Sequence, residues 1–364
     1  MNVATARTYN FETGVYRPPS EGGSSSLLIR VTRNCPWNRC AFCSMYKGEK
    51  FELRSQEEVK TDIDSIAAIC NRLKSISWKL GYGGEINRNV AIALLEREPE
   101  LNTSHGFVMI YNWLVSGGKT AFLQDANSLI LPTEKLVDIL QHLRKTFPSL
   151  SRVTSYVRAK TLAQKKLEEL VEIRKAGLDR LHVGLETGDD VLLKRIKKGV
   201  TSEGQISGGR KAMEAGFQLS EYWMPGLGGK EMWQDHAKNT ARVLNEINPN
   251  YIRSRPFFPS PGSPLFEAHS KGELQLLTPR EELIELKVMM EQLNVTSKVC
   301  FDHASNCWRG QRGRLLFSHS YEGYRFPDEK SRVLKLMDEG IEVQKDTPGN
   351  ESFRNMLEGR YFVR

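Results

Sequence analysis

The feature that most constrains this chain is a group of cysteines near its amino terminus. Cys35, Cys40 and Cys43 lie within nine residues, in the spacing C-x4-C-x2-C. The apolar run 27–31 precedes them and predicts a strand that leads directly into the cysteine loop. Three thiolates on one short loop can converge on a metal centre.

The three cysteines suit an iron–sulfur cluster better than a zinc ion. A structural zinc site needs four ligands, and the next cysteine and histidine along the chain are only Cys70 and His105. A cluster held by three cysteines leaves one iron open, where a small molecule can bind and accept an electron. A disulfide framework is disfavoured because six cysteines are few for 364 residues and no signal peptide is visible. A zinc or structural site stays open as the alternative.

Composition indicates a globular protein with a moderate excess of positive charge. The chain has 52 Lys and Arg against 44 Asp and Glu, a net charge of +8. An anionic partner such as tRNA or a phospholipid headgroup would suit that charge, but the only notable basic cluster, 309–314, is small, so a nucleic-acid partner is not favoured. No run of about 18 apolar residues occurs, so we expect no membrane span. The cytoplasm is the expected location, because it keeps thiols and clusters reduced.

Strand and helix patterns alternate along most of the chain, which implies a parallel sheet with right-handed crossovers. Six such units predict an α/β fold of the partial (β/α)6, TIM-like barrel type, with the reactive site at the carboxyl ends of the strands. The expected strands are 26–32, 119–124, 152–157, 180–185, 217–224 and 251–255. The expected helices are 57–80, 88–97, 106–115, 133–143, 162–176, a stretch ending at 215, 231–247 and 279–294.

These elements suggest three parts of the chain. Residues 1–25 are expected to be irregular, and residues 26–260 to form the barrel, with a helical insertion at about 85–118. Residues 261–364 are expected to form a helical and irregular extension that covers the barrel mouth.

The cysteine loop resembles the cluster-binding loop of radical S-adenosylmethionine (SAM) enzymes. In that family three cysteines hold a [4Fe-4S] cluster, and SAM chelates the fourth iron through its amino and carboxylate groups. An aromatic residue usually precedes the last cysteine, as Phe42 does here. The commonest family spacing is C-x3-C-x2-C, so this loop has one extra residue between Cys35 and Cys40. The resemblance covers residues from about 12 to 265 and implies an open (β/α)6 barrel.

Two segments compete for the turn that binds the SAM amino group, which the family places after the second strand. Residues 83–85 read Gly-Gly-Glu, a common family form, but they follow a long helix, and glycines commonly end helices. Residues 124–127 follow an expected strand, and a carboxylate there can accept hydrogen bonds from an ammonium group. We therefore expect Gln124, Asp125 and Asn127 to contact SAM.

Later strand ends complete the expected SAM pocket. Residues 184–188 resemble a segment of the coproporphyrinogen-dehydrogenase and methylthiotransferase branch, whose glutamate can bind a ribose or ammonium group; an acidic helix start is the alternative. Residues 224–229 resemble that branch's glycine turn beside the adenine, against a plain loop. Arg158 is a candidate for the SAM carboxylate, with a surface ion pair as the alternative. The contacts expected here are Ser155, Arg158, Glu186, Met224, Pro225 and Gly226.

Two further groups have weaker patterns. Arg253 and Arg255 alternate at the end of the last expected strand, so they lie on one face and are candidates for an anionic substrate group. The group Cys300, His303 and Cys307 does not have a familiar ligand spacing. Cys70 lies on the apolar stripe of its helix and is expected to be a packed core thiol.

The resemblance implies an enzyme that cleaves SAM reductively and uses the resulting 5′-deoxyadenosyl radical to abstract hydrogen from an unidentified substrate. A small donor such as flavodoxin or ferredoxin is the implied source of the electron. The absence of a cysteine before Cys35 argues against a methylthiotransferase, and the segment after residue 265 is too short for an elongator-type acetyltransferase domain. A non-catalytic, haem-chaperone-like cofactor protein and an RNA-binding metal protein stay open as alternatives.

Overall fold

The computed structural model describes residues 10–14, 26–103 and 105–344. They divide into two compact units. The first contains Met1–Asn38, Tyr46–Gly184 and Ser207–Ser220, and the second contains Arg39–Met45, Leu185–Ile206 and Glu221–Arg364. The cysteine loop passes from one unit to the other, with Cys35 in the first and the other two cysteines in the second. The three-part division expected from the sequence stays a prediction.

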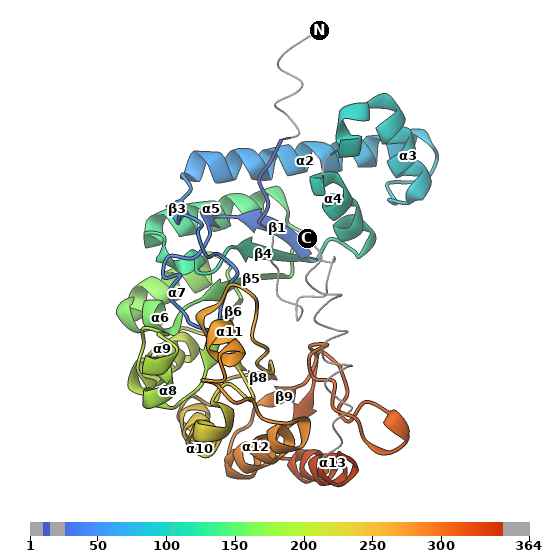
Figure 1. Ribbon diagram of the computed structural model, residues 1–364. Coiled ribbons are helices and arrows are strands. Elements are labelled where there is room, and N and C mark those ends of the chain that lie inside the picture. Colours follow the sequence, from blue (N-terminus) through green and yellow to red (C-terminus); the bar gives the residue numbers. More distant parts are fainter. Residues whose placement is uncertain (1–9, 15–25, 104, 345–364) are drawn as a thin grey trace. The chain divides into compact units, whose positions relative to one another are not determined.

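A mostly parallel sheet confirms the α/β fold class. Its strand order is β1-β4-β5-β6-β7-β8-β9-β10, and a separate pair, β2 with β3, flanks the cysteine loop (Figure 1). The strands are β1 (Ser26–Arg30), β2 (Thr32–Arg33), β3 (Glu52–Leu53), β4 (Thr120–Gln124), β5 (Arg152–Val157), β6 (Arg180–Glu186), β7 (Gln218–Trp223), β8 (Tyr251–Ser254), β9 (Lys298–Cys300) and β10 (Tyr324–Arg325).

Register within the first unit brings three strand ends to one edge. β1, β4 and β5 pair in parallel, with Ile29 opposite Leu123 and Leu123 opposite Ser155. Phe122 and Leu123 are fully buried although they point to opposite faces, as expected for a central strand covered on both sides. The residues that follow these strands therefore emerge side by side, with Asp125 directly after β4.

The helices in chain order are α2 (Gln56–Lys79), α3 (Arg88–Arg97), α4 (His105–Val115), α5 (Thr133–Thr146), α6 (Ala159–Gln164), α7 (Leu167–Lys175), α8 (Asp190–Arg195), α9 (Ser202–Glu214), α10 (Gly229–Ile247), α11 (Pro264–Ser270), α12 (Pro279–Gln292) and α13 (Lys330–Val343). Short 3-10 turns cover Pro99–Thr103, Ser128–Ile130 and Gln311–Gly313. None of the helices in the described residues is long and apolar enough to span a membrane.

The long helix α2 forms as its sequence predicts. Ser55 caps it and exchanges hydrogen bonds with Glu58 in a capping box. Cys70 lies on its buried stripe, where burial raises the pKa of the thiol to about 12, so this cysteine is a core residue. Figure 1 shows α2 (blue) next to α3 and α4.

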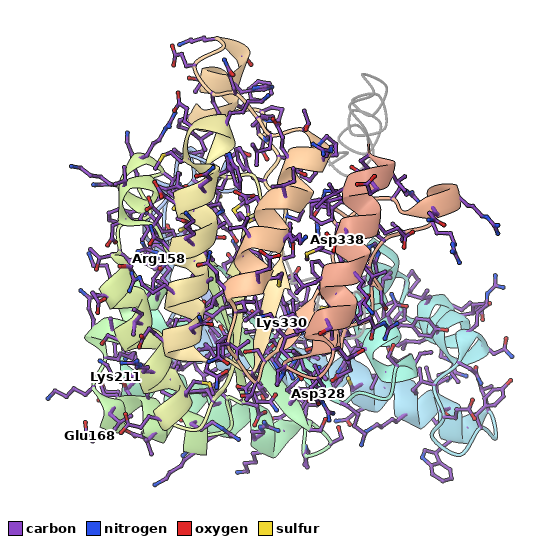
Figure 2. The ribbon with its side chains drawn as sticks, turned by 90° about the horizontal axis from the view of Figure 1, so that it is seen from below. Arg158, Glu168, Lys211, Asp328, Lys330 and Asp338 are labelled. Atoms are coloured by element: carbon purple, nitrogen blue, oxygen red, sulfur yellow. The ribbon has the colours of Figure 1, made fainter. Side chains whose placement is uncertain are left out.

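One predicted helix, 162–176, is wrong because the structure has two helices there, α6 and α7. The amino group of Lys211 on α9 donates to the carbonyl oxygens of Ala163 (2.6 Å) and Lys165 (2.7 Å), which occupies acceptors at the end of α6. The backbone of Lys166 is extended, and its amide donates to the Glu169 carboxylate at 2.9 Å, which starts α7. Lys211 is labelled in Figure 2.

The segment after residue 295 is more regular than the irregular tail that the sequence predicts. It adds β9, parallel to β8, then β10, antiparallel to β9, and then α13. Figure 2 shows α10 (yellow), α12 (orange) and α13 (red) lying side by side. Lys287 on α12 pairs with Asp338 on α13 at 2.6 Å, and Lys330 donates to the carbonyl oxygens of Glu291 (2.8 Å) and Leu293 (2.7 Å) at the end of α12.

Candidate functional site

The cysteine loop is irregular, and none of its three cysteines forms a disulfide. Cys35, Cys40 and Cys43 are unbridged and half-buried. Asn34 (φ 66°) and Asn38 (φ 45°) adopt left-handed backbone conformations, which asparagine tolerates well, and the Asn38 amide donates to Sγ of Cys35 at 3.4 Å. In the second unit the Ala41 amide donates to the Ile196 carbonyl at 2.8 Å, which ties this part of the loop to the end of α8.

The donor set of this loop fits an iron–sulfur cluster. It offers three soft thiolates, which iron–sulfur clusters prefer and which leave one iron for another ligand. Within the ranges that the structure describes, no three His, Cys, Asp or Glu side chains are already gathered for a metal ion. The assignment of Cys35, Cys40 and Cys43 as cluster ligands therefore depends on donor chemistry and spacing.

Asp125 is fixed next to the first cysteine. Its Oδ2 accepts hydrogen bonds from the amide of Asn34 (2.9 Å) and from Nε of Arg30 (3.0 Å), and it pairs with Nη2 of Arg30 at 2.9 Å. Its Oδ1 is buried and has no hydrogen-bond partner among the residues that the structure describes. Asp125 therefore combines a structural role through one oxygen with an unused, buried acceptor on the other.

A short N-terminal segment lies against the end of β4. The amide of Gly14 donates to Oε1 of Gln124 (2.8 Å), and Nε2 of Gln124 donates back to the Gly14 carbonyl (3.0 Å). A Cβ on Gly14 would lie 2.2 Å from Oδ1 of Asp125, so only glycine fits there. Gln124, which we expected to contact SAM, thus binds the chain's own backbone through both of its amide atoms.

Glu12 anchors this segment in a cluster of arginines. It accepts hydrogen bonds from Arg33 (Nη2, 2.7 Å) and Arg30 (Nη1, 2.6 Å), and Arg54 lies 3.5 Å away. Burial acts against the charge of Glu12, but these guanidinium groups outweigh it and lower the pKa of the carboxyl group. The segment is therefore held by charge at Glu12 and by main-chain hydrogen bonds at Gly14.

Asn127 and Ser155 are buried and bonded within the first unit. Nδ2 of Asn127 donates to the Thr161 hydroxyl (2.9 Å), and its Oδ1 accepts from the Arg158 amide (3.1 Å). The Ser155 hydroxyl lies within 3.2 Å of the Leu123 carbonyl oxygen. Both side chains therefore hold strand ends in place, and their role as SAM contacts stays a prediction.

Arg158 faces the cysteine loop. Its guanidinium carbon lies 4.8 Å from the centre of the Trp37 ring, and the amino group of Lys160 lies 5.7 Å from the same ring. A cleft of about 410 Å³ beside them, which we call the Pro36 cleft, includes Pro36, Ile130 and Lys165 in its lining. Arg158 is labelled in Figure 2. The sequence did not single out Trp37, although a tryptophan between two cluster cysteines is a visible signal.

In the second unit Glu186 is paired with a buried lysine. Oε1 of Glu186 lies 2.7 Å from Nζ of Lys198, and the backbone of Glu186 is left-handed (φ 63°). Lys198 also lies 5.6 Å from the ring centre of Phe42. Glu221 is buried and interacts electrostatically with Lys198. Burial raises the pKa of the Glu221 carboxyl group well above its usual value, while the charge of Lys198 acts to lower it. The sequence missed Lys198 and Glu221 because their positions have no motif.

The 224–226 turn is held from beneath by two buried side chains. Nε2 of His236 lies 3.0 Å from the Met224 carbonyl, and the Gly226 amide donates to Oε2 of Glu285 at 2.5 Å. Gly226 has a φ of +81°, and the Pro225 carbonyl accepts from the amide of Phe257 at 2.8 Å. The His236 and Glu285 contacts, which come from α10 and α12, could not be read from the sequence.

Arg253, within β8, and Arg255, directly after it, have different surroundings. Arg253 is fully buried, its Nη1 pairs with Asp302 at 2.9 Å, and its guanidinium lies 4.5 Å from the Tyr321 ring centre. Asp302 therefore compensates the charge that we expected to bind an anionic substrate group. Arg255 is half-buried. The pKa of His303 is lowered to about 3, mainly because His303 is buried and also because the positive charge of Arg255 is near.

Cys300 has the environment of a structural thiol. It is fully buried in β9, and burial raises its pKa to about 12. Its Sγ lies 3.5 Å from the Tyr321 carbonyl.

Comparisons with known proteins give distant relatives. No protein-family model matches the chain. The chain is 27% identical over 120 residues to the tRNA uridine(34) acetyltransferase of Methanocaldococcus jannaschii, a match that covers 33% of this chain and 22% of that protein. It is 26% identical over 180 residues to the haem chaperone HemW of Bacillus subtilis, covering 48% of this chain and 46% of that protein. The chain thus spans less than half the length of each curated relative.

One solved structure matches the chain at low sequence identity and a low TM-score. Coproporphyrinogen III oxidase (HemN) from Escherichia coli, described as a radical SAM enzyme, matches with 15% identity and a TM-score of 0.45, covering 80% of this chain and 60% of that chain. The spacing and donor set of the cysteine loop resemble those of the radical SAM superfamily.

Proposed function

We propose that the protein is a radical SAM enzyme. Cys35, Cys40 and Cys43 would hold a [4Fe-4S] cluster, and SAM would bind beside it. The cluster with SAM supplies one-electron reductive cleavage to a 5′-deoxyadenosyl radical, which abstracts hydrogen from a substrate that is still unidentified. A compartment as reducing as the cytoplasm suits a loop whose three cysteines form no disulfide.

The observation that carries the proposal is the position of Asp125. Its Oδ2 accepts a hydrogen bond from the amide of Asn34, the residue before Cys35, while its Oδ1 is buried and has no partner within the described part of the chain. A buried carboxylate oxygen without a partner is costly unless a ligand completes it. The SAM ammonium group has the donors that such an oxygen needs.

The remaining SAM contacts follow from the second unit. Glu186 is the candidate for a ribose or ammonium group, and its pairing with Lys198 fixes the carboxylate. The turn 224–226 is the candidate for the adenine because it resembles the glycine turn of the branch named above. Gly226 is buried and has no side chain of its own between its main chain and a flat base. Gln124, Asn127, Ser155, Arg158 and Phe42 are proposed as further contacts or as residues that position them.

Arg255 is the better candidate for an anionic group of the substrate. The charge of Arg253 is balanced by Asp302 at 2.9 Å, whereas Arg255 acts on His303 and has no ion pair among the described residues. We therefore propose Arg255 as the substrate contact and Arg253 as a residue that fixes the end of β8.

A haem-chaperone-like role is the second candidate, because one curated relative is named as a haem chaperone. That role needs a haem-binding surface and does not need SAM cleavage. The two functions therefore predict different products from the same reconstituted protein.

Anaerobic reconstitution with iron and sulfide tests the proposal. The expected result is four irons per chain and 5′-deoxyadenosine from SAM when dithionite is added. Cys40→Ala should abolish both, whereas Cys70→Ala, which changes a core thiol, should keep both. Stoichiometric zinc without SAM cleavage would contradict the enzyme, and haem transfer without 5′-deoxyadenosine would favour the chaperone.

A further inference from the structure

We propose that the Pro36 cleft is the docking site for an acidic electron-carrier protein that reduces the cluster. The inference rests on the proposed function, which consumes one electron for each SAM cleaved. It adds the place on the surface where the electron enters and the residues that recognise the carrier.

The cleft lies against the cluster loop itself. Pro36, which lines it, is the residue directly after Cys35, and Trp37 follows. All of the residues that line the cleft belong to the first unit. A carrier seated there would contact the same loop that holds the first cluster ligand, so its redox group would approach the cluster across few atoms.

The cleft carries a concentration of positive charge. Arg158, Lys160 and Lys165 line it, and the first two lie over the face of Trp37 at 4.8 Å and 5.7 Å. Its one acidic residue, Glu169, is engaged by the Lys166 amide (2.9 Å), by Thr133 (2.7 Å) and by Lys165 (3.3 Å).

Lys160 supplies the charge that is least compensated. Within the part of the chain that the structure describes, it forms no ion pair with a carboxylate. Half-buried between the cleft and Trp37, it keeps its ammonium group available to a partner. A carboxylate-rich surface is the complement of such a site, and complementary charge steers association and fixes register.

Apolar surface accompanies the charge. Ile130, which lines the cleft, is 38% exposed, and Pro36 lines the same cleft. Apolar residues surrounded by arginine and lysine are typical of a protein interface whose rim is polar. Lys165 is fixed by Thr133 (2.9 Å) and Glu169 (3.3 Å), but half-buried Lys160 and exposed Ile130 differ from the buried, fixed groups that a small-ligand pocket uses, so a protein surface is the occupant that fits.

Binding of flavodoxin to the reconstituted protein is the first test, because it does not require SAM cleavage. Lys160→Glu should weaken flavodoxin binding about tenfold at low ionic strength. Lys74→Glu, the same charge change at an exposed position of α2 outside the cleft, should leave the affinity unchanged. Equal weakening by both variants, or no weakening by Lys160→Glu, would overturn the docking site.

The rate of 5′-deoxyadenosine formation with two reductants is the second test. In Lys160→Glu the flavodoxin-driven rate should fall about tenfold and the dithionite-driven rate should not change, because dithionite needs no docking surface. Loss of the dithionite-driven rate as well would assign the cleft to SAM or to another small anion and would overturn the proposal. If wild-type protein forms no 5′-deoxyadenosine with dithionite, the proposed function fails, and the binding comparison still decides whether the cleft recognises flavodoxin.

Discussion

Gly226 and Glu285 are 59 residues apart in sequence, and the amide of the first donates a 2.5 Å hydrogen bond to the carboxyl group of the second. Glu285 is fully buried on α12, and burial raises its pKa well above the usual value. Burial therefore favours the neutral form of the carboxyl group that holds the turn proposed for the adenine of SAM. The contact links α12 to the turn that follows β7.

The first prediction concerns this pair. Glu285→Gln keeps an acceptor for the Gly226 amide and should change the free energy of unfolding by less than about 1 kcal/mol at pH 5. Glu285→Ala leaves a buried amide unpaired and should cost about 1–3 kcal/mol. Urea unfolding measures both.

The same pair predicts a pH dependence. The pKa of Glu285 is raised in the folded protein, so the unfolded chain releases the proton at a lower pH than the folded protein does. The contribution of Glu285 to the free energy of unfolding is therefore full below pH 4.5 and is lost as pH rises. Glu285→Gln should therefore gain stability relative to wild type between pH 5 and 8. The exposed control Glu273→Gln should show no such gain. Parallel pH profiles for wild type and Glu285→Gln would contradict the assignment.

The second prediction concerns His236, which responds to pH in the opposite direction. Burial lowers its pKa to about 4 from the usual 6.5. Below pH 6.5 the His236 side chain is protonated in the unfolded chain but stays neutral in the folded protein. The free energy of unfolding therefore falls as pH drops towards 4, by up to about 3 kcal/mol. His236→Gln should lose less stability between pH 7 and pH 4.5 than wild type does, in urea titrations at both values. An unchanged loss would show that His236 is not the group responsible.

His303 acts in the same pH range, so the effect of His236→Gln should be partial. Burial is the main cause that lowers the pKa of His303, to about 3. The double change His236→Gln with His303→Gln should therefore flatten the acid side of the profile further than either single change.

Local patterns predicted most of the parallel-strand region. Three elements have ends within one residue of those expected: the strand 152–157 and the helices 88–97 and 57–80. Their apolar periodicity, capping residues and terminal glycines are local signals that neighbouring residues provide. The break between α6 and α7 was missed because it depends on Lys211, a residue more than 40 positions further along the chain. β9 was missed because it is only three residues long and is stabilised by pairing with β8, which the local sequence does not reveal.

Site residues were predictable by type and position but not by partner. The carboxylate of Asp125 lies after β4 as expected, yet its bonds to Arg30 and Asn34 could not be foreseen. The alternation of Arg253 and Arg255 correctly placed two cations at one strand end. It could not show that Asp302, 49 positions later, pairs with Arg253, because a sequence pattern gives the face of a strand and not the neighbours supplied by tertiary structure.

The third prediction concerns the pair Glu186 and Lys198. Their side chains are only 13% and 10% exposed, so Lys198→Met leaves a carboxylate without its cation in a poorly solvated place and should cost about 3–5 kcal/mol. Adding Glu186→Gln should recover part of that loss. The exposed pair Arg195 and Glu231 is the control, since truncating it should cost at most about 1 kcal/mol. Similar costs for the two pairs in a double-mutant cycle would refute a special role for Lys198.

The fourth prediction concerns Gly14, which approaches the proposed SAM site from the N-terminal segment. Gly14→Ala would place a methyl group 2.2 Å from Oδ1 of Asp125, so either the segment must lift or the carboxylate must move. Lifting breaks two hydrogen bonds with Gln124, and moving the carboxylate disturbs the amide of Asn34 beside Cys35. We expect a loss of about 1–3 kcal/mol in urea unfolding and a weaker affinity for SAM after reconstitution.

Gly48→Ala separates crowding from backbone strain in this experiment. Gly48 has a left-handed backbone (φ +83°), which Gly14 does not have, and no atom of the described residues lies within 4 Å of a Cβ built there. Alanine at that position should cost only about 1 kcal/mol and should leave SAM affinity unchanged. If both variants lose stability but both keep the wild-type affinity for SAM, Gly14 is needed only for its local structure. A loss of SAM affinity confined to Gly14→Ala is the result expected if Oδ1 of Asp125 receives the ammonium group, because that oxygen is the atom that the new methyl group would displace.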